Sequence, residues 1–115
     1  MLKRLATIDR FHLARLGRFM RFLKSTSEGE GSMLDHTMIM FGSGMNSGKG
    51  GEHSPNNLPL LVAGGKSFGL KHGQHLAFEK EKHPPLSNVL LTLIQKMGVE
   101  AEKFNDSTGT LTGLV

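Results

Sequence analysis

Apolar and polar residues follow a helical pattern at the start of the chain. Apolar side chains recur every three or four residues, and arginines fall largely between them. This spacing predicts an amphipathic helix over about residues 5–26, with Thr7 as its N-cap and the Gly- and Ser-rich segment 25–32 as its end. We interpret the arginines as the solvated face of a helix that packs on the core through its apolar side. The apolar positions are Leu5, Ile8, Phe11, Phe19, Phe22 and Leu23, widened by Leu16 and Met20.

Two short, unbroken apolar runs follow this helix. They are "TMIMF" at 37–41 and "LPLLVAG" at 58–64. Continuous apolar runs of this length, bounded by turn residues, are typical of strands that are buried on both faces, as in parallel sheets covered by helices. The pattern therefore predicts two central strands in a small, mostly parallel sheet.

The rest of the chain holds one further strong periodic pattern. Residues 65–84 are rich in Gly and Lys and predict a loop, with "QHLAFE" at 74–79 as a short edge strand. From Pro85 onward, apolar spacing predicts a helix over about 85–97 that ends at Gly98. Residues 98–115 lack periodicity and predict a tail on the surface. Together these elements predict an α/β protein, a single partial domain over 1–115 with two amphipathic helices around the sheet.

Length and composition allow one modest domain. The chain has 115 residues, of which 37% are hydrophobic, with 15 Gly and no Trp or Tyr. Such a chain is thin in large core side chains, so we expect part of its apolar surface to need a partner or a missing segment. The absence of cysteine removes thiolate zinc sites, a catalytic cysteine and disulfides. No apolar run is long enough for a membrane span.

Positive charge is concentrated in the first helix. The 14 Lys and Arg outnumber the 10 Asp and Glu, and residues 1–24 hold seven of the basic residues against Asp9 alone. Such a segment suits an anionic surface, a nucleic acid or a neighbouring part of a larger fold. Its arginine-rich, acid-poor pattern also has the character of an organelle transit peptide. No aromatic platform interleaves the charges, so we expect no nucleic-acid partner.

The loop between the two predicted strands is the main candidate for chemistry. A phosphate-binding loop would need Gly at position 43 and Ser or Thr at position 50, where this chain has Ser43 and Gly50. A serine nucleophile would need G-x-S-x-G before a helix, and Ser43 lies one place early. A metal site would rest on His53, which precedes a buried strand, but a catalytic zinc usually has three protein ligands. A solvated histidine in a plain connection stays open.

Several sequence blocks occur in a recognisable order. The clearest are "GSGM" at 42–45, "NNLPLLVAGG" at 56–65 and "DSTG" at 106–109. Over nearly its whole length the chain resembles the C-terminal part of the bacterial family named for its HXXSHH motif, whose function is not established. The motif itself is absent from this chain. The resemblance implies a missing N-terminal part of the same protein, a secreted or periplasmic location, and a distant similarity to the alkaline phosphatase and sulfatase superfamily.

This resemblance implies a location and a chemistry for a site. In that superfamily a three-layer α/β fold holds a metal pair at the carboxyl ends of its strands. His53 matches a metal-ligand position, while Ser43 and Gly44 stand where the superfamily has Asp and His. The resemblance implies a divalent metal such as zinc in the full-length protein, and hydrolysis of a small-molecule or polymeric phosphate or sulfate ester. The loop residues expected to line this site are Ser43, Met45, Asn46 and Asn57.

Two other hypotheses belong to different functional classes. A non-catalytic binding or structural protein on the same scaffold would have lost its metal ligands, as the residues at 43 and 44 indicate. An independent basic module would bind anionic polymers through residues 1–24 and would do so in a salt-dependent manner.

Overall fold

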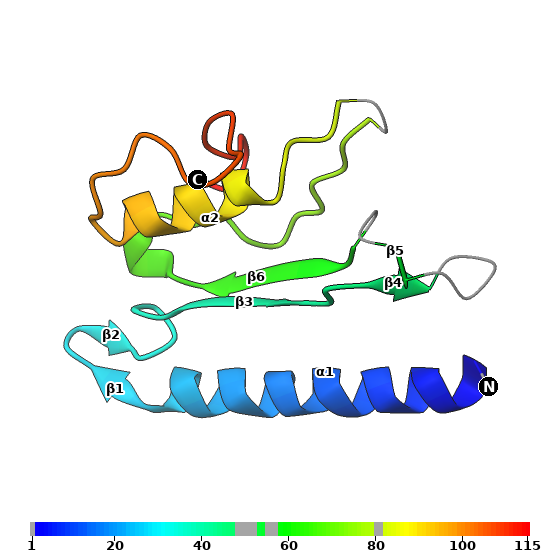
Figure 1. Ribbon diagram of the computed structural model, residues 1–115. Coiled ribbons are helices and arrows are strands. Elements are labelled where there is room, and N and C mark those ends of the chain that lie inside the picture. Colours follow the sequence, from blue (N-terminus) through cyan, green and yellow to red (C-terminus); the bar gives the residue numbers. More distant parts are fainter. Residues whose placement is uncertain (1, 48–52, 55–57, 80–81) are drawn as a thin grey trace.

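The computed structural model describes residues 2–47, 53–54, 58–79 and 82–115. Two α-helices lie on opposite faces of a two-stranded sheet, as Figure 1 shows. The helices are α1 (Leu2–Ser25) and α2 (Ser87–Lys96), and the strands are β3 (Met38–Gly42) and β6 (Leu60–Gly64). The described part of the chain is therefore a helix–sheet–helix sandwich, which agrees with the expected mixture of helix and strand.

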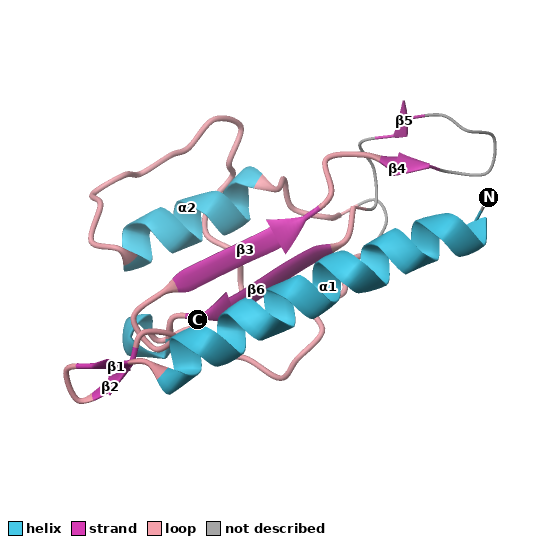
Figure 2. Ribbon diagram, turned by 90° about the horizontal axis from the view of Figure 1, so that it is seen from below, coloured by secondary structure: helices cyan, strands magenta, loops and turns pink. Residues whose placement is uncertain are grey.

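Shorter elements lie at the two ends of this sheet. Figure 2 shows one hairpin next to the end of α1 and a second beyond the end of β3. The first pairs β1 (Ser27–Glu28) with β2 (Gly31–Ser32), and the second pairs β4 (Asn46–Ser47) with β5 (His53–Ser54). A short 3-10 helix, η1 (Lys66–Phe68), follows β6.

The central sheet is antiparallel, so the prediction of a mostly parallel sheet is wrong. Met38 lies opposite Gly64 and Gly42 lies opposite Leu60. A parallel pair would need a crossover that returns the chain to the opposite end of the sheet, whereas here the chain enters β6 at the end where it leaves β3. The apolar runs are continuous because a helix lies over each face of the pair, and this coverage does not depend on strand direction.

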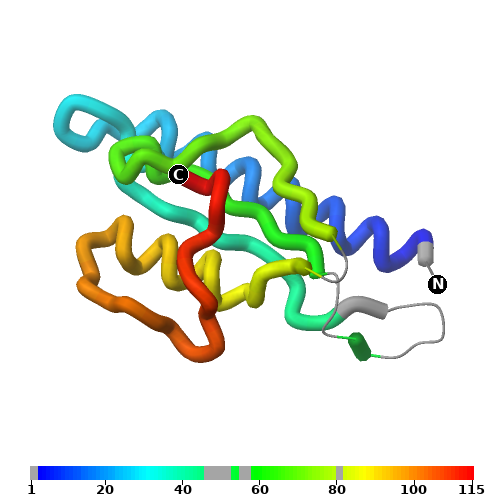
Figure 3. Tube along the Cα trace, turned by 90° about the horizontal axis from the view of Figure 1, so that it is seen from above, coloured from blue at the N-terminus to red at the C-terminus, as the bar shows by residue number. Residues whose placement is uncertain are grey.

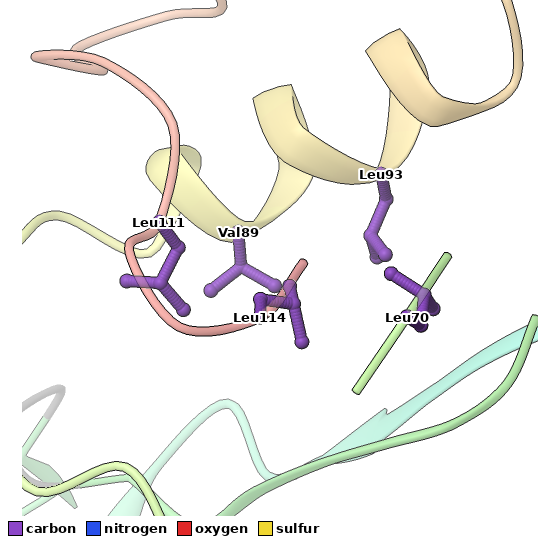
Figure 4. Close-up of a cluster of buried hydrophobic side chains, with 5 residues drawn as sticks. All are labelled: Leu70, Val89, Leu93, Leu111 and Leu114. Atoms are coloured by element: carbon purple, nitrogen blue, oxygen red, sulfur yellow. The ribbon is translucent and has the colours of Figure 1, made fainter. Parts of the chain in front are cut away.

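The main core lies between α2 and one face of the β3–β6 sheet. Five buried side chains form a cluster, drawn in Figure 4, and Met38, Leu60 and Val62 of the sheet pack against it. The cluster consists of Leu70, Val89, Leu93, Leu111 and Leu114. Because side chains alternate along a strand, Phe41 and Leu61 belong to the opposite face, toward α1, and Leu61 is exposed there. The two faces of the sheet are therefore buried to different degrees.

The last residues of the chain belong to the core, so the prediction of a surface tail is wrong. Leu111 and Leu114 are both buried in the cluster. Figure 3 shows the end of the chain reaching the segment after η1, where the Lys71 N–H donates to the Leu114 carbonyl oxygen at 2.9 Å. The inward leucines alternate with turns, such as the one at Gly113 with a φ of 90°. An irregular backbone of this kind buries apolar side chains without any periodic pattern.

Buried polar side chains of α2 hold this tail. Asn88 donates from Nδ2 to Thr108 Oγ1 at 3.1 Å and accepts the Thr108 N–H through Oδ1 at 2.9 Å. The Leu111 N–H donates to Thr92 Oγ1 at 2.7 Å. Asn88 and Thr92 are both buried, so these bonds satisfy backbone groups that an irregular segment cannot pair by itself. The "DSTG" block is thus part of the contact between α2 and the tail.

The ends of the helices agree with prediction in part. The first helix begins at Leu2, so Thr7 lies inside it and donates from Oγ1 to the Lys3 carbonyl oxygen at 3.0 Å instead of capping the helix. The second helix is followed by Gly98 with a φ of 85°, as predicted for the residue that ends it. Residues 74–79 form no strand, and the segment after η1 is irregular.

Candidate functional site

The turn after β3 is closed by its own serine. The Ser43 hydroxyl donates to the Met45 carbonyl oxygen at 2.7 Å, and the Met45 N–H donates back to Ser43 Oγ at 3.4 Å. The Ser43 N–H donates to the Pro59 carbonyl oxygen at 3.4 Å, which ties the turn to the start of β6. A Cβ on Gly42 would lie 2.8 Å from that same oxygen, so glycine permits the close approach. The Ser43 hydroxyl thus stabilises a local turn.

His53 lies in the hairpin beyond this turn. It forms part of β5 and lies opposite Ser47 of β4 in the antiparallel register, and it is exposed. Figure 2 shows the β4–β5 hairpin past the end of the β3–β6 sheet. The turn and the hairpin therefore place Ser43, Met45, Asn46 and His53 at one end of the molecule. Asn57, the fourth residue expected to line the site, lies outside the described residues.

The described residues do not fit a metal centre. Among them, no three His, Asp or Glu side chains lie close enough together to hold a metal ion. Zinc in a catalytic site usually needs three protein ligands, and an exposed histidine supplies one. Further ligands for His53 would have to come from outside the described residues or from another chain, and we derive no chemical step through a metal here.

A second candidate surface lies on α1, where the sequence predicted that the apolar side chains pack on the core. Large apolar side chains on this helix are exposed to solvent, with Phe11 at 54% and Phe22 at 61% of their full accessibility. The sequence predicted that the helix packs on the core through its apolar side. Among the large apolar side chains of α1 whose burial is described, this holds for Leu16, Met20 and Leu23, which are half-buried or buried. We define the α1 surface as the exposed apolar side chains Ile8, Phe11, Phe19 and Phe22, which lie within about 80° of one another around the helix. Leu5 and Leu13 are exposed as well, but at roughly 100° per residue they lie close to the side that carries Leu16, Met20 and Leu23.

The width of the sheet explains why this surface is exposed. The two strands lie about 4.8 Å apart, whereas a helix with its side chains is about 10–12 Å across. At roughly 100° per residue, Phe11 and Phe22 lie more than 100° around the helix from the side that carries Leu16 and Leu23. A two-stranded sheet cannot reach that far. The sequence did contain one indication of this exposure. The apolar residues of the first helix extend around more of its circumference than one narrow sheet can cover.

Open hollows accompany the exposed rings. One, of about 450 Å³, lies between α1 and β3 and is lined by His12, Arg15, Leu16, Phe19 and Phe41. A second, of about 540 Å³, lies near the end of α1 and is lined by Arg18, Arg21, Phe22, Lys24 and Ser25. Both combine phenylalanine rings with arginine side chains.

Positive charge surrounds the same rings. The helix α1 carries seven basic residues and one acidic residue, Asp9. The Arg15 guanidinium carbon lies 4.7 Å from the centroid of the Phe11 ring, a cation–π distance. The ion pair between Lys82 and Glu79 lies outside α1, and no basic residue of α1 forms an ion pair within the part of the chain that the structure describes. No described helix is both long enough and apolar enough to cross a membrane.

Comparisons with protein-family models, curated proteins and solved structures give no match for this chain. The resemblance to the HXXSHH family therefore stays a prediction from the sequence blocks.

Proposed function

We propose that this chain is the C-terminal part of a longer HXXSHH-family protein and that it acts there as a non-catalytic binding unit. The α1 surface carries this proposal. It exposes three phenylalanines on a helix whose other side packs on the sheet. Exposed apolar surface of this kind, bordered by charged groups, is typical of a site that binds a partner.

The narrow sheet supports a place in a larger fold. Among the described residues, β3 and β6 pair only with each other. Each of these strands has one edge that no other described strand pairs with, and such an edge can accept a further strand. In this proposal the helix–sheet–helix sandwich is one portion of a broader three-layer α/β fold of the alkaline phosphatase type.

An apolar fluorescent probe tests whether the α1 surface is available. Anilinonaphthalene sulfonate (ANS) should bind the chain and fluoresce, because the exposed phenylalanines offer it an apolar surface. The double variant Phe11→Gln/Phe22→Gln should lower that fluorescence and leave the urea midpoint nearly unchanged, since the rings are exposed. The matched control is Phe78→Gln, which removes an exposed ring outside α1. Equal ANS fluorescence in the double variant and the wild type would contradict the proposal.

A metal-dependent ester hydrolase is the second candidate. Its support is the position of His53, which the β4–β5 hairpin sets at the same end of the sheet as the Ser43 turn. In this alternative the longer protein is secreted or periplasmic, supplies the other ligands of a divalent metal such as zinc, and acts on phosphate or sulfate esters.

Metal analysis of the full-length protein tests this alternative. We expect about one zinc or similar ion to be lost from His53→Ala, because a catalytic zinc with three protein ligands binds poorly with two. His75→Ala, which removes another exposed histidine, serves as the control and should keep its metal. An unchanged metal content in His53→Ala would exclude His53 as a ligand.

A further inference from the structure

We propose that the α1 surface binds the surface of a lipid bilayer with anionic headgroups. This inference rests on the proposed function, because it names the partner of the same surface. Helices that lie in a membrane interface combine an apolar side with a polar side rich in Lys and Arg, and their average hydrophobicity is low. The helix α1 has this composition and is 24 residues long.

The arrangement of side chains suits a helix that lies flat on a bilayer. At about 1.5 Å per residue, Phe11 and Phe22 are roughly 16 Å apart along the axis, and they lie within about 20° of each other around it. Arg15 and Arg18 fall between them in the sequence and close to the same side. The Arg15 guanidinium already rests on the Phe11 ring at 4.7 Å, so its aliphatic stem can follow the ring while its charge reaches a headgroup.

Charge decides between the possible partners. The helix α1 has seven basic residues and one acidic residue, and no ion pair neutralises these basic residues in the described part of the chain. A second copy of this helix would bring the same positive charge and be repelled. A nucleic acid would match the charge but offers no apolar interior for Ile8 and the exposed phenylalanine rings. An anionic bilayer matches both, since its headgroups attract the cations and its acyl boundary accepts the apolar side chains.

Binding of this kind leaves the helix in the interface. The apolar side chains of an interfacial helix enter about 5–10 Å into the boundary between headgroups and acyl chains. Leu16, Met20 and Leu23 can stay on the sheet meanwhile, because they lie on another side of the helix. The sandwich of sheet and α2 would then sit above the membrane.

Vesicle sedimentation tests the inference on the 115-residue chain. We expect the wild type to sediment with vesicles of equimolar phosphatidylcholine and phosphatidylglycerol, and not with phosphatidylcholine alone. Binding should weaken in 1 M salt, where the Debye length falls to about 3 Å. Phe11→Gln/Phe22→Gln should weaken binding by about tenfold or more, because burying one phenylalanine contributes at least that factor. Arg15→Gln/Arg18→Gln should weaken it and reduce its salt dependence.

Controls keep the test specific. Lys71→Gln/Lys103→Gln removes two exposed cations outside α1 and should bind like the wild type. Circular dichroism and the urea midpoint confirm that each variant is folded. The inference is overturned if anionic vesicles fail to bind a chain that still binds ANS through α1, and that result leaves the binding-unit proposal intact. Binding to duplex DNA that is independent of the phenylalanines, or self-association without vesicles, would replace the lipid as partner.

Discussion

Replacing Gly64 with alanine is expected to unfold the protein at room temperature. Gly64 ends β6 with a φ of 72°, a conformation that L side chains rarely adopt. An added Cβ would overlap the carbonyl oxygen of Thr37 and lie 2.8 Å from that of Leu34. Both obstacles are backbone atoms next to β3, so no side-chain rotation relieves them. We expect a loss above about 4 kcal/mol, a large share of the roughly 5–15 kcal/mol that stabilises an ordinary domain.

Circular dichroism and urea unfolding measure this loss. Gly73→Ala is the matched control, because Gly73 has a φ of 75° and no atom within 4 Å of an added Cβ. It should cost only the left-handed backbone strain, about 1–2 kcal/mol. If the two variants were equally stable, the close crossing of β6 over the chain entering β3 would be wrong.

Replacing Leu93 with alanine is expected to cost about 3 kcal/mol of unfolding free energy. Leu93 is buried in the cluster between α2 and the sheet, beside Leu70 (Figure 4). Removal of its side-chain carbons loses their transfer free energy and leaves a cavity that the neighbouring side chains only partly fill. Because the cluster is small, the loss of one leucine affects a large fraction of it.

Two controls separate this cavity from other effects. Leu93→Met keeps most of the volume and should cost less than about 1.5 kcal/mol. Leu86→Ala shortens an exposed leucine at the start of the same helix and should stay within about 0.5 kcal/mol of the wild type. A loss in Leu86→Ala as large as in Leu93→Ala would mean that burial in the cluster does not set the cost of shortening a leucine in this part of the chain.

The positions of the helices and the two central strands were predictable, because the order of apolar and polar residues depends on local structure. The runs at 37–41 and 58–64 do form β3 and β6, displaced by one or two residues. Their direction was not predictable, because an unbroken apolar run says that both faces are covered and nothing about how the chain returns. The buried tail was missed for a related reason, since Leu111 and Leu114 turn inward from irregular backbone that polar side chains of α2 hold in place.

The sequence predicted the candidate site around His53 but not the α1 surface. His53 was selected through its place before an apolar run and through a family resemblance, and the structure adds its position in a hairpin at the end of the sheet. The α1 surface was hidden because periodicity identifies an apolar side without saying what covers it. The number of strands beneath the helix decides that, and strand pairing is a long-range property that no local pattern contains.

The uneven attachment of the two helices has a consequence for the opening motions of the fold. In the described residues α1 buries one side chain, Leu23, whereas α2 buries six residues and is tied to the tail by hydrogen bonds. The free energy of a local opening rises with the number of buried contacts that the opening breaks. The helix α1 can therefore lift away from the sheet at low cost while α2, β6 and the tail stay assembled. We therefore expect α2, β6 and the tail to unfold together as one cooperative unit, and α1 to detach from that unit independently.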